Sequence, residues 1–322
     1  MKTITTLFKI CFAVLFLSIA SCSSDDSGEP IEPIGPINTG ELKLFAIDTA
    51  KVNTISMTGT NEQTVLNKLV NSSSYIGDFC LSPDGTKFIY VNQQMEGEVP
   101  NLVFIKEIRK ANIDGTGDVK LYETPDAETY IGKIKYCSDG KIFFGTYTNF
   151  PNVTRNLHVM NADGTGLTDL NWGSEIMDVS DDRAYYLVET TAGPQILDAD
   201  ADNGMPGLYH AENLNSAESI EDGVFTNDGK YVVLPYKESN TIKARVIDMA
   251  TKTSETITLI TGLGDGWISY HLEMSSDGKR GVVTITGSDY TKSKTYVFNI
   301  ETQTVETPFE NNDENIFDVY AY

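Results

Sequence analysis

The sequence predicts an all-β protein, a six-bladed β-propeller of four-stranded antiparallel blades. Three observations predict this fold: short runs of alternating apolar and polar residues, a tight turn that recurs before β-rich runs, and chain ends that complete one another as a blade. We expect residues 41–322 to form the propeller, after a signal peptide at 1–21 and an acidic, Pro- and Gly-rich tether at 22–40.

The turn that recurs is followed each time by an aromatic and β-branched run. Its five copies are Asp84-Gly85, Asp139-Gly140, Asp181-Asp182, Asp228-Gly229 and Asp277-Gly278. Asp-Gly suits a tight hairpin because Gly accepts a positive φ and Asp can hydrogen-bond within its own turn. Successive copies lie 42 to 55 residues apart, and this spacing is typical of four-stranded blades.

A second hairpin motif follows each turn and predicts the connection between the third and fourth strands. It reads N-x-D-G-T-G within 110–122 and 158–170, with degenerate copies at 209–220, 245–257 and 297–309. These motifs define five blades. The sixth forms from the two chain ends, with its first strand from 316–322 and its other three strands from the region after residue 41. This closure removes the open sheet edges that a linear array would leave.

The motifs S-P-D-G-x-K-x-I, at 82–89, and N-x-D-G-T-G resemble those of the TolB-like, or WD40-like, six-bladed propeller family. The resemblance covers about residues 41–322 and implies the architecture only, because this fold hosts scaffolds, binders, lyases and hydrolase-associated domains. TolB carries an extra N-terminal domain for which we expect no room in this chain, so its cellular role does not transfer. The sequence has no G-x-S-x-G nucleophile elbow, so the resemblance to peptidase-associated propellers implies no catalytic domain.

The N-terminus predicts the compartment. Lys2 and Lys9 precede an apolar run that is too short to span a bilayer but suits a secretory signal. Residues 19–22 resemble the lipobox of bacterial lipoproteins, so we expect Cys22 to be acylated; the alternative is an ordinary secretion signal. The acidic residues of 23–26 resemble a surface-export signal. We therefore expect a lipid-anchored protein of the outer membrane, exposed at the cell surface, with a periplasm-facing orientation left open.

The net charge limits the partners. The chain has 46 Asp and Glu against 24 Lys and Arg, a formal net charge of −22. A surface this acidic repels nucleic acid and anionic lipid headgroups. The expected partner is thus an envelope protein, a glycan or a small molecule, with membrane attachment through the lipid on Cys22.

A set of ionisable residues recurs six positions before the turn Asp, at the start of the innermost strand of each blade. With the matching residue of the sixth blade, the set is Asp78, Lys133, Glu175, Asp222, His271 and Asp318. Aromatic residues stand three or four positions further out, at Tyr75, Tyr130, Trp172 and Trp267. We expect a funnel at the mouth of the central channel, with aromatic faces for a sugar or other planar ligand above polar groups. The alternative is that the aromatics pack between blades and the charges merely solvate the channel.

A calcium site is the only cofactor site for which the sequence offers a candidate. We expect a long loop at 189–207 of blade 3, in which Asp198, Asp200 and Asp202 alternate as in a calcium-binding loop. The Gly stands one place late and no Glu occupies the twelfth position, which favours a solvated acidic loop without a cofactor. Cys80 and Cys137 are expected to be buried free thiols.

These features favour a binding protein that uses the channel mouth to hold a ligand or partner, and no catalytic residue is predicted. One alternative is a carbohydrate-active lyase or hydrolase, with Glu175 and Asp222 as paired carboxylates and His271 or Lys133 assisting. A structural protein that organises other envelope proteins through its rim is the other alternative.

Overall fold

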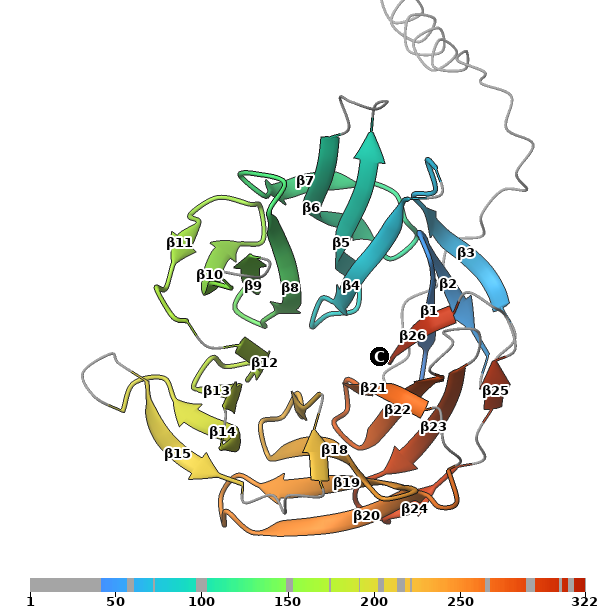
Figure 1. Cartoon of the computed structure of the whole chain (residues 1–322), viewed down its shortest axis with the longest axis vertical. Coiled ribbons are helices and arrows are strands. Elements are labelled where there is room, and N and C mark those ends of the chain that lie inside the picture. The colour runs from blue at the N-terminus through green and yellow to red at the C-terminus, as the bar shows by residue number, and fades with distance from the viewer. Residues whose placement is uncertain are drawn as a thin grey trace, which may run out of the picture. The chain divides into compact units, whose positions relative to one another are not determined.

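The computed structural model shows six antiparallel blades around a central axis (Figure 1) and confirms the predicted fold class. It describes residues 42–56, 61–71, 73–96, 103–148, 153–173, 175–190, 192–201, 206–212, 218–220, 222–263, 267–287, 293–306, 309–311 and 316–321. The expected signal peptide and tether lie outside these residues. Within them, no helix is long and apolar enough to cross a membrane.

Blades 1 to 3 each contain four strands that pair in chain order. Blade 1 consists of β4 (Tyr75–Leu81), β5 (Lys87–Glu96), β6 (Val103–Asn112) and β7 (Val119–Glu123). Blade 2 consists of β8 (Thr129–Tyr136), β9 (Lys141–Thr148), β10 (Arg155–Asn161) and β11 (Thr168–Asp169). Blade 3 consists of β12 (Glu175–Val179), β13 (Tyr185–Thr190), β14 (Gly193–Asp198) and β15 (Gly207–Ala211).

Blades 4 and 5 each have one strand position that is divided into two short strands. In blade 4 both β16 and β17 pair with β18, and in blade 5 both β24 and β25 pair with β23. Blade 4 consists of β16 (Glu218–Ile220), β17 (Val224–Phe225), β18 (Tyr231–Glu238), β19 (Thr241–Asp248) and β20 (Ser254–Ile260). Blade 5 consists of β21 (Trp267–Met274), β22 (Arg280–Gly287), β23 (Ser293–Asn299), β24 (Thr304–Val305) and β25 (Phe309–Asn311).

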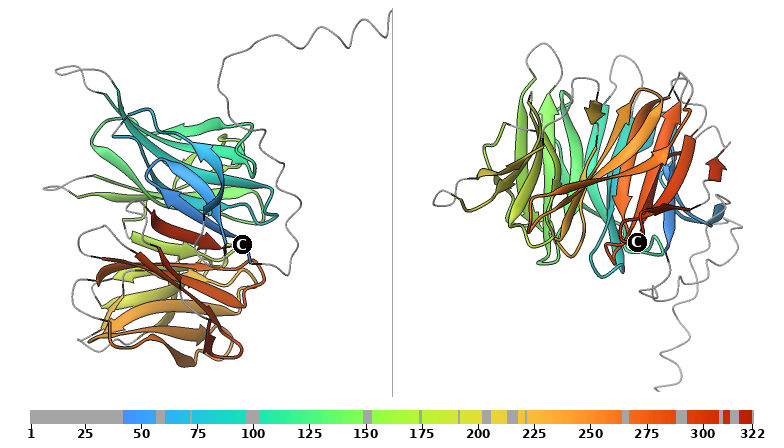
Figure 2. Two further views of the ribbon diagram at one scale, coloured as in Figure 1. Left: turned by 90° about the vertical axis from the view of Figure 1, so that its right-hand side faces the viewer. Right: turned by 90° about the horizontal axis from the view of Figure 1, so that it is seen from below.

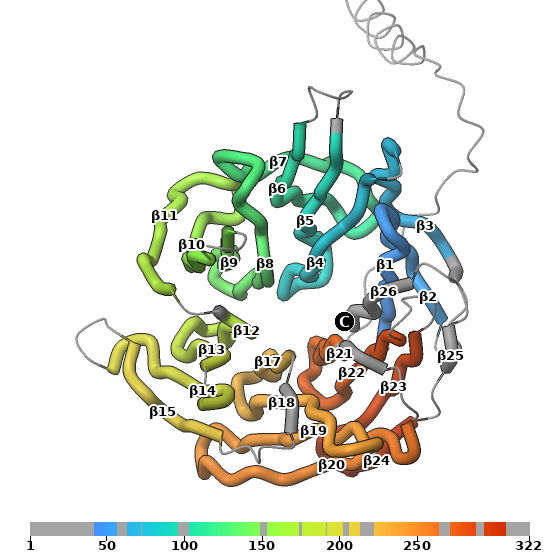
Figure 3. The backbone as a smooth tube through the Cα atoms, in the orientation of Figure 1, coloured from blue at the N-terminus to red at the C-terminus, as the bar shows by residue number. Residues whose placement is uncertain are grey.

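The sixth blade joins the two ends of the propeller, as the sequence predicts. It consists of β26 (Ile316–Ala321), β1 (Leu44–Asp48), β2 (Lys51–Ile55) and β3 (Asn61–Asn67). The innermost strand β26 pairs antiparallel with β1, with Leu44 opposite Ala321 and Ile47 opposite Asp318. Strand β26 lies beside β1 (Figure 1). The backbone trace shows β4, β8, β12, β17 and β21 facing the same axis (Figure 3).

The turns of blades 1 and 3 share one hydrogen-bond pattern, and this pattern corrects the alignment of blade 3. In blade 1 the Ser82 hydroxyl donates to Asp84 Oδ1 at 2.6 Å, and Gly85 has a φ of 64°. In blade 3 the Ser180 hydroxyl donates to Asp182 at 2.7 Å, and Arg183 takes the glycine position with a φ of 63°. The turn Asp of blade 3 is therefore Asp182, one residue after the position from which Glu175 was counted.

The apolar cores lie between adjacent blades. One cluster combines Met177 and Leu187 of blade 3 with Phe225 and Leu234 of blade 4, all buried. Similar clusters lie between the other neighbouring blades, so each blade packs both faces against its neighbours. Figure 2 shows the blades in two side views. The edges of the innermost strands remain available for polar groups along the axis.

The expectation of a long loop at 189–207 is wrong. This range contains β14, the third strand of blade 3, and part of β15, the fourth. The stretch at 209–220, predicted to be a degenerate copy of the second hairpin, contains the end of β15 and the first strand of blade 4. Blade 3 lacks the N-x-D-G-T-G motif that marks the corresponding turn in blades 1 and 2, which caused this misassignment.

Candidate ligand-binding site at the central axis

Three of the predicted ionisable residues meet around one carboxylate. Lys133 Nζ lies 3.2 Å from Asp222 Oδ1, although the two residues belong to blades 2 and 4. His271 Nδ1 of blade 5 lies 3.3 Å from Asp222 Oδ2. The structure therefore places Lys133, Asp222 and His271 together, and Asp222 is only 7% exposed.

Inner-strand carboxylates also connect neighbouring blades. Asp78 Oδ2 accepts a hydrogen bond from the backbone N–H of Ile134 at 2.7 Å. Asp222 Oδ2 accepts one from the backbone N–H of Leu272 at 2.8 Å. These bonds run from blade 1 to blade 2 and from blade 4 to blade 5. A buried carboxylate that accepts such a bond satisfies a backbone donor while it holds two blades together.

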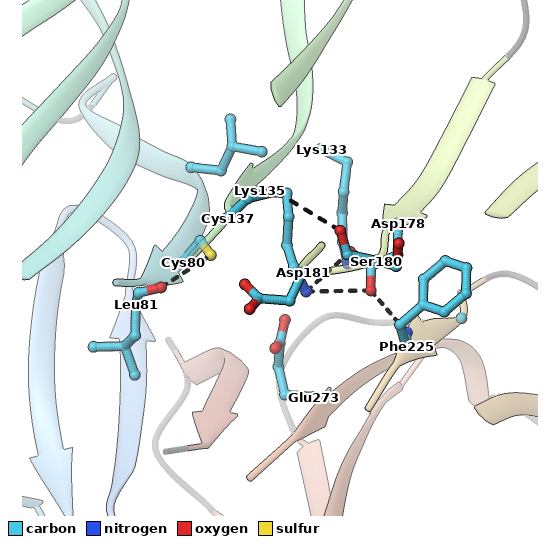
Figure 4. Close-up of polar contacts among 12 residues, drawn as sticks. Cys80, Leu81, Lys133, Lys135, Cys137, Asp178, Ser180, Asp181, Phe225 and Glu273 are labelled. Carbon is cyan, nitrogen blue, oxygen red and sulfur yellow. Dashed lines mark hydrogen bonds and ion pairs between the residues drawn. The ribbon is translucent and has the colours of Figure 1, made fainter. Parts of the chain in front are cut away.

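A second layer of charges lies two residues further along the inner strands, and the sequence analysis missed it. Asp178 accepts a hydrogen bond from the backbone N–H of Phe225 at 2.8 Å, the same connection between blades 3 and 4. Its other oxygen lies 3.1 Å from Lys135 Nζ. Figure 4 shows Lys133 and Lys135 extending toward Asp178, with Glu273 approaching the same space. Counting four residues back from Asp182 and from the other turn Asp residues would have found this layer.

The two aligned aspartates differ in electrostatic environment. Burial raises the pKa of the Asp78 carboxyl to about 6, against the attraction of the Lys133 ammonium. Burial also acts to raise the pKa of Asp222, but Lys133 and His271 together hold it well below its usual range. Burial acts to lower the pKa of Lys133. The attraction of Asp222 and Asp78 outweighs this effect of burial, so the pKa of Lys133 is raised. The surroundings thus stabilise the ionised form of Asp222 and destabilise the ionised form of Asp78.

Three predicted residues have strand positions but lie outside the described side chains. Glu175 in β12 pairs with Glu189, Asp318 in β26 pairs with Ile47, and Trp267 in β21 pairs with Gly287. Their proposed place at the channel mouth stays a prediction.

Trp172 lies between blades. Its ring packs edge-on against Tyr186, with centroids 5.0 Å apart, in the apolar cluster of Phe143 and Leu157. This position corresponds to the alternative expectation, in which an aromatic residue of the repeat packs blade to blade.

The predicted tyrosines of blades 1 and 2 lie beside a third tyrosine that the sequence analysis missed. Tyr130 stacks on Tyr147 of the neighbouring strand β9, with ring centroids 5.5 Å apart and an angle of 18°. Lys106, which is 2% exposed, places its ammonium 3.3 Å from the centre of the Tyr130 ring. The same ammonium donates to the carbonyls of Ala127 and Thr129. The Tyr75 hydroxyl donates to Gln93 Oε1 at 2.5 Å, and burial raises its pKa, with smaller contributions from Tyr147 and Tyr130.

A cavity of about 200 Å³ lies between blades 2 and 3, and we call it the inter-blade cavity. It combines both members of the Lys133–Asp222 pair with the exposed residues Arg155 and Glu189 and two glycines. Its lining is Gly132, Lys133, Gly145, Thr146, Tyr147, Arg155, Asn156, Leu157, Ile176, Met177, Glu189 and Asp222. A second cavity, of about 150 Å³, lies at the hairpin end of the inner strands, beside Cys80, Lys135 and Glu273.

The calcium candidate is only partly described. Asp198 ends β14, and its carboxylate accepts the backbone N–H of Asp200 at 3.0 Å. Asp202 lies outside the described residues. Among the residues that are described, no group of three or more His, Cys, Asp or Glu side chains is placed to hold a metal ion.

Cys80 and Cys137 are free thiols. Cys80 is half-buried and Cys137 fully buried. Burial raises the pKa of Cys80 to about 12 and raises that of Cys137 as well. Both thiols therefore stay protonated and weakly nucleophilic at neutral pH.

Comparison with known proteins shows similarity in fold. No protein-family model matches the chain, and no curated protein matches its sequence. TolB from Acinetobacter baumannii superposes with a TM-score of 0.63 and 13% identity, over 88% of this chain and 67% of that one. A periplasmic gluconolactonase of Pseudomonas aeruginosa gives 0.57 and 11%, over 87% and 99%. An oligogalacturonate lyase from Vibrio parahaemolyticus gives 0.51 and 11%, over 84% and 79%.

These similarities define the fold as a six-bladed β-propeller similar to that of TolB. The named proteins include both TolB and two enzymes, and at such low identity the likeness extends to the fold alone. Function must therefore be argued from the residues of this chain.

Proposed function

We propose that the protein is a non-catalytic binding protein of the cell envelope, which holds a ligand or protein partner at the inter-blade cavity beside the central axis. The observation that carries this proposal is the cavity itself, where Arg155 and Glu189 lie exposed beside the ion pair of half-buried Lys133 and buried Asp222. A concave site with a few converging polar groups is the usual form of a ligand site in proteins.

The bonding of the axial residues favours binding over catalysis. Asp222 accepts backbone hydrogen bonds from Leu272 and from Gly223 while it pairs with Lys133. His271 has one ring nitrogen beside Asp222 and the other 3.2 Å from Glu273. A general base needs a lone pair directed at substrate, and His271 Nδ1 is instead directed at Asp222. These groups are arranged to hold the ring together.

Catalysis by a lyase or hydrolase is the second candidate. It is supported by the two neighbouring folds named as a gluconolactonase and an oligogalacturonate lyase. Turnover of an aldonolactone or of oligogalacturonate by the purified chain, lost in Asp222→Asn while the ring stays folded, would replace the binding function with this one.

Attachment to the outer membrane through an acylated Cys22 is part of the proposal. It is supported by the lipobox-like residues 19–22 and by the acidic residues that follow. A lipid at Cys22 and the tether to residue 40 would hold the propeller near the membrane while the inter-blade cavity stays accessible. The gluconolactonase with a similar fold is named as periplasmic, which is compatible with a location in the cell envelope.

The experiment that tests the binding face is photo-crosslinking in the native cell. A photoreactive residue replaces exposed Glu189 at the inter-blade cavity, or, as the matched control, exposed Asn227 in the turn between β17 and β18. The two sites lie at opposite ends of the inner strands. We expect capture of a specific partner or ligand from position 189 and none from position 227. Equal capture from both, or capture from position 227 alone, would contradict the proposal.

A further inference from the structure

We propose that the inter-blade cavity binds one ring of an uncharged sugar. This inference names the ligand class for the binding function proposed above and rests on it. It is drawn from three properties of the cavity, namely its size, the balance of charges on its wall and a fixed aromatic ring.

The size suits a single six-membered ring with polar substituents. The cavity measures about 200 Å³, whereas a cavity of about 150 Å³ accepts benzene. Two glycines on adjacent strands create this space. A Cβ at Gly145 would meet nothing within 4 Å, and one at Gly132 would meet its nearest neighbours at 3.8 Å. Any larger residue at position 145 would project into the cavity.

The charges on the wall balance. Lys133 and Arg155 are cationic, and Asp222 and Glu189 are anionic. The Lys133–Asp222 pair is already formed at 3.2 Å, so an anionic ligand would have to compete with Asp222 for the ammonium. Sugar hydroxyls both donate and accept, so they can hydrogen-bond to either sign without a net charge of their own. This balance favours a neutral polyol over an acid or an amine.

The aromatic wall is fixed before any ligand binds. Tyr147 lines the cavity and is 39% exposed, while one neighbour, Tyr130, stacks on its ring. Tyr130 is held in turn by the buried ammonium of Lys106. The C–H groups of a sugar ring are attracted to the negative face of an aromatic ring, and a ring already fixed loses little entropy on binding. A flat C–H face and a rim of hydroxyls match this wall and the charges around it.

The test is isothermal titration of the full chain with a panel of neutral monosaccharides, the matching uronic acids and zwitterionic amino acids. We expect a neutral sugar to bind with a Kd of about micromolar to millimolar. We expect its uronic acid to bind at least about tenfold more weakly, because the acid competes with Asp222. An acid or amino acid that binds more tightly than every neutral sugar would overturn the inference.

Two variants locate the binding. Gly145→Leu fills the cavity and should weaken sugar binding about a hundredfold or more. Tyr147→Ala keeps the space, removes the aromatic face and should weaken it about tenfold. The control Leu208→Asn, on the outer strand β15 at 63% exposed, should leave it unchanged. Sugar binding that persists in a folded Gly145→Leu protein would place the sugar elsewhere and contradict the inference.

The two proposals fail in distinguishable ways. If no neutral sugar binds but position 189 still captures a specific partner in the cell, the sugar inference is wrong and the binding function stands. If no sugar binds and position 189 captures nothing, both are wrong.

Discussion

Asp78 and Asp222 form a matched pair for testing the electrostatics of the axis. Both stand six residues before their turn Asp, both are at most 8% exposed, and both accept a backbone N–H from the next blade. An Asn at either position keeps an oxygen for that hydrogen bond and removes the charge. The structure predicts opposite effects of this one substitution, because the two pKa shifts have opposite signs.

The magnitude for Asp78 follows from its pKa, which rises from 3.8 to about 6 on folding. One pKa unit corresponds to about 1.4 kcal/mol, so ionised Asp78 costs the folded state about 3 kcal/mol. Between these two pKa values the folded state binds more protons than the unfolded state. The free energy of unfolding therefore falls as the pH rises, and the full cost of ionised Asp78 is reached above about pH 6. Asp78→Asn should therefore stabilise the protein by about 1–3 kcal/mol near pH 8 and by little near pH 4.

Asp222→Asn should have the opposite effect. The pKa of Asp222 lies below its unfolded value, so its stabilising contribution is present above that value and is lost only in strong acid. Removing the charge leaves half-buried Lys133 without its ion-pair partner and should cost about 3 kcal/mol near pH 8.

Urea unfolding of the full chain, followed by circular dichroism near pH 8 and pH 4, measures both effects by linear extrapolation. Wild-type protein and the two variants are compared under the same conditions. If Asp78→Asn loses as much stability as Asp222→Asn near pH 8, the reasoning about the axial charges is refuted.

Three further predictions follow from packing, thiol burial and the N-terminus. Gly281→Ala would place a Cβ 2.2 Å from a ring carbon of buried Phe298. This overpacking should lower the free energy of unfolding by about 1–3 kcal/mol, as thermal or urea unfolding would show, and unchanged stability would contradict the packing. Cys80 and Cys137 should resist alkylation by iodoacetamide until the protein unfolds, as mass spectrometry of the modified peptides would show; rapid modification of Cys137 in folded protein would contradict its burial. Cys22→Ser should release the protein from the membrane fraction of its cells, and a variant that still sediments with membranes would contradict lipid attachment.

The architecture was largely predictable because each blade repeats its turn chemistry. The Ser-x-Asp hydrogen bonds around Asp84 recur at Asp182, and a ring of repeats must close, so the chain ends could be assigned to one blade. Blade 3 was harder to read because Arg183 replaces the glycine of the turn and adopts its positive φ. That substitution displaced the count by one residue, so Glu175 was predicted from Asp181. Asp178 belongs to the second layer, four residues before Asp182, which a count of six residues cannot reach.

The inter-blade cavity could not be predicted from the repeat. Its wall combines Tyr147 and Arg155 of blade 2 with Glu189 of blade 3, which stand on the second and third strands and share no common position in the repeat. Whether a space remains between two blades depends on the volume of every side chain at the interface. Trp172 shows the same limit, since sequence spacing alone could not distinguish an exposed ring from one packed on Tyr186.

The most direct test of the central claim is a crystal structure of the full chain grown with a saturating neutral monosaccharide. We predict a sugar ring in the inter-blade cavity, with its C–H face on Tyr147 and its hydroxyls at the Lys133–Asp222 pair. A cavity that contains only solvent, or a sugar bound instead at the opposite end of the axis beside Cys80 and Glu273, would contradict the claim.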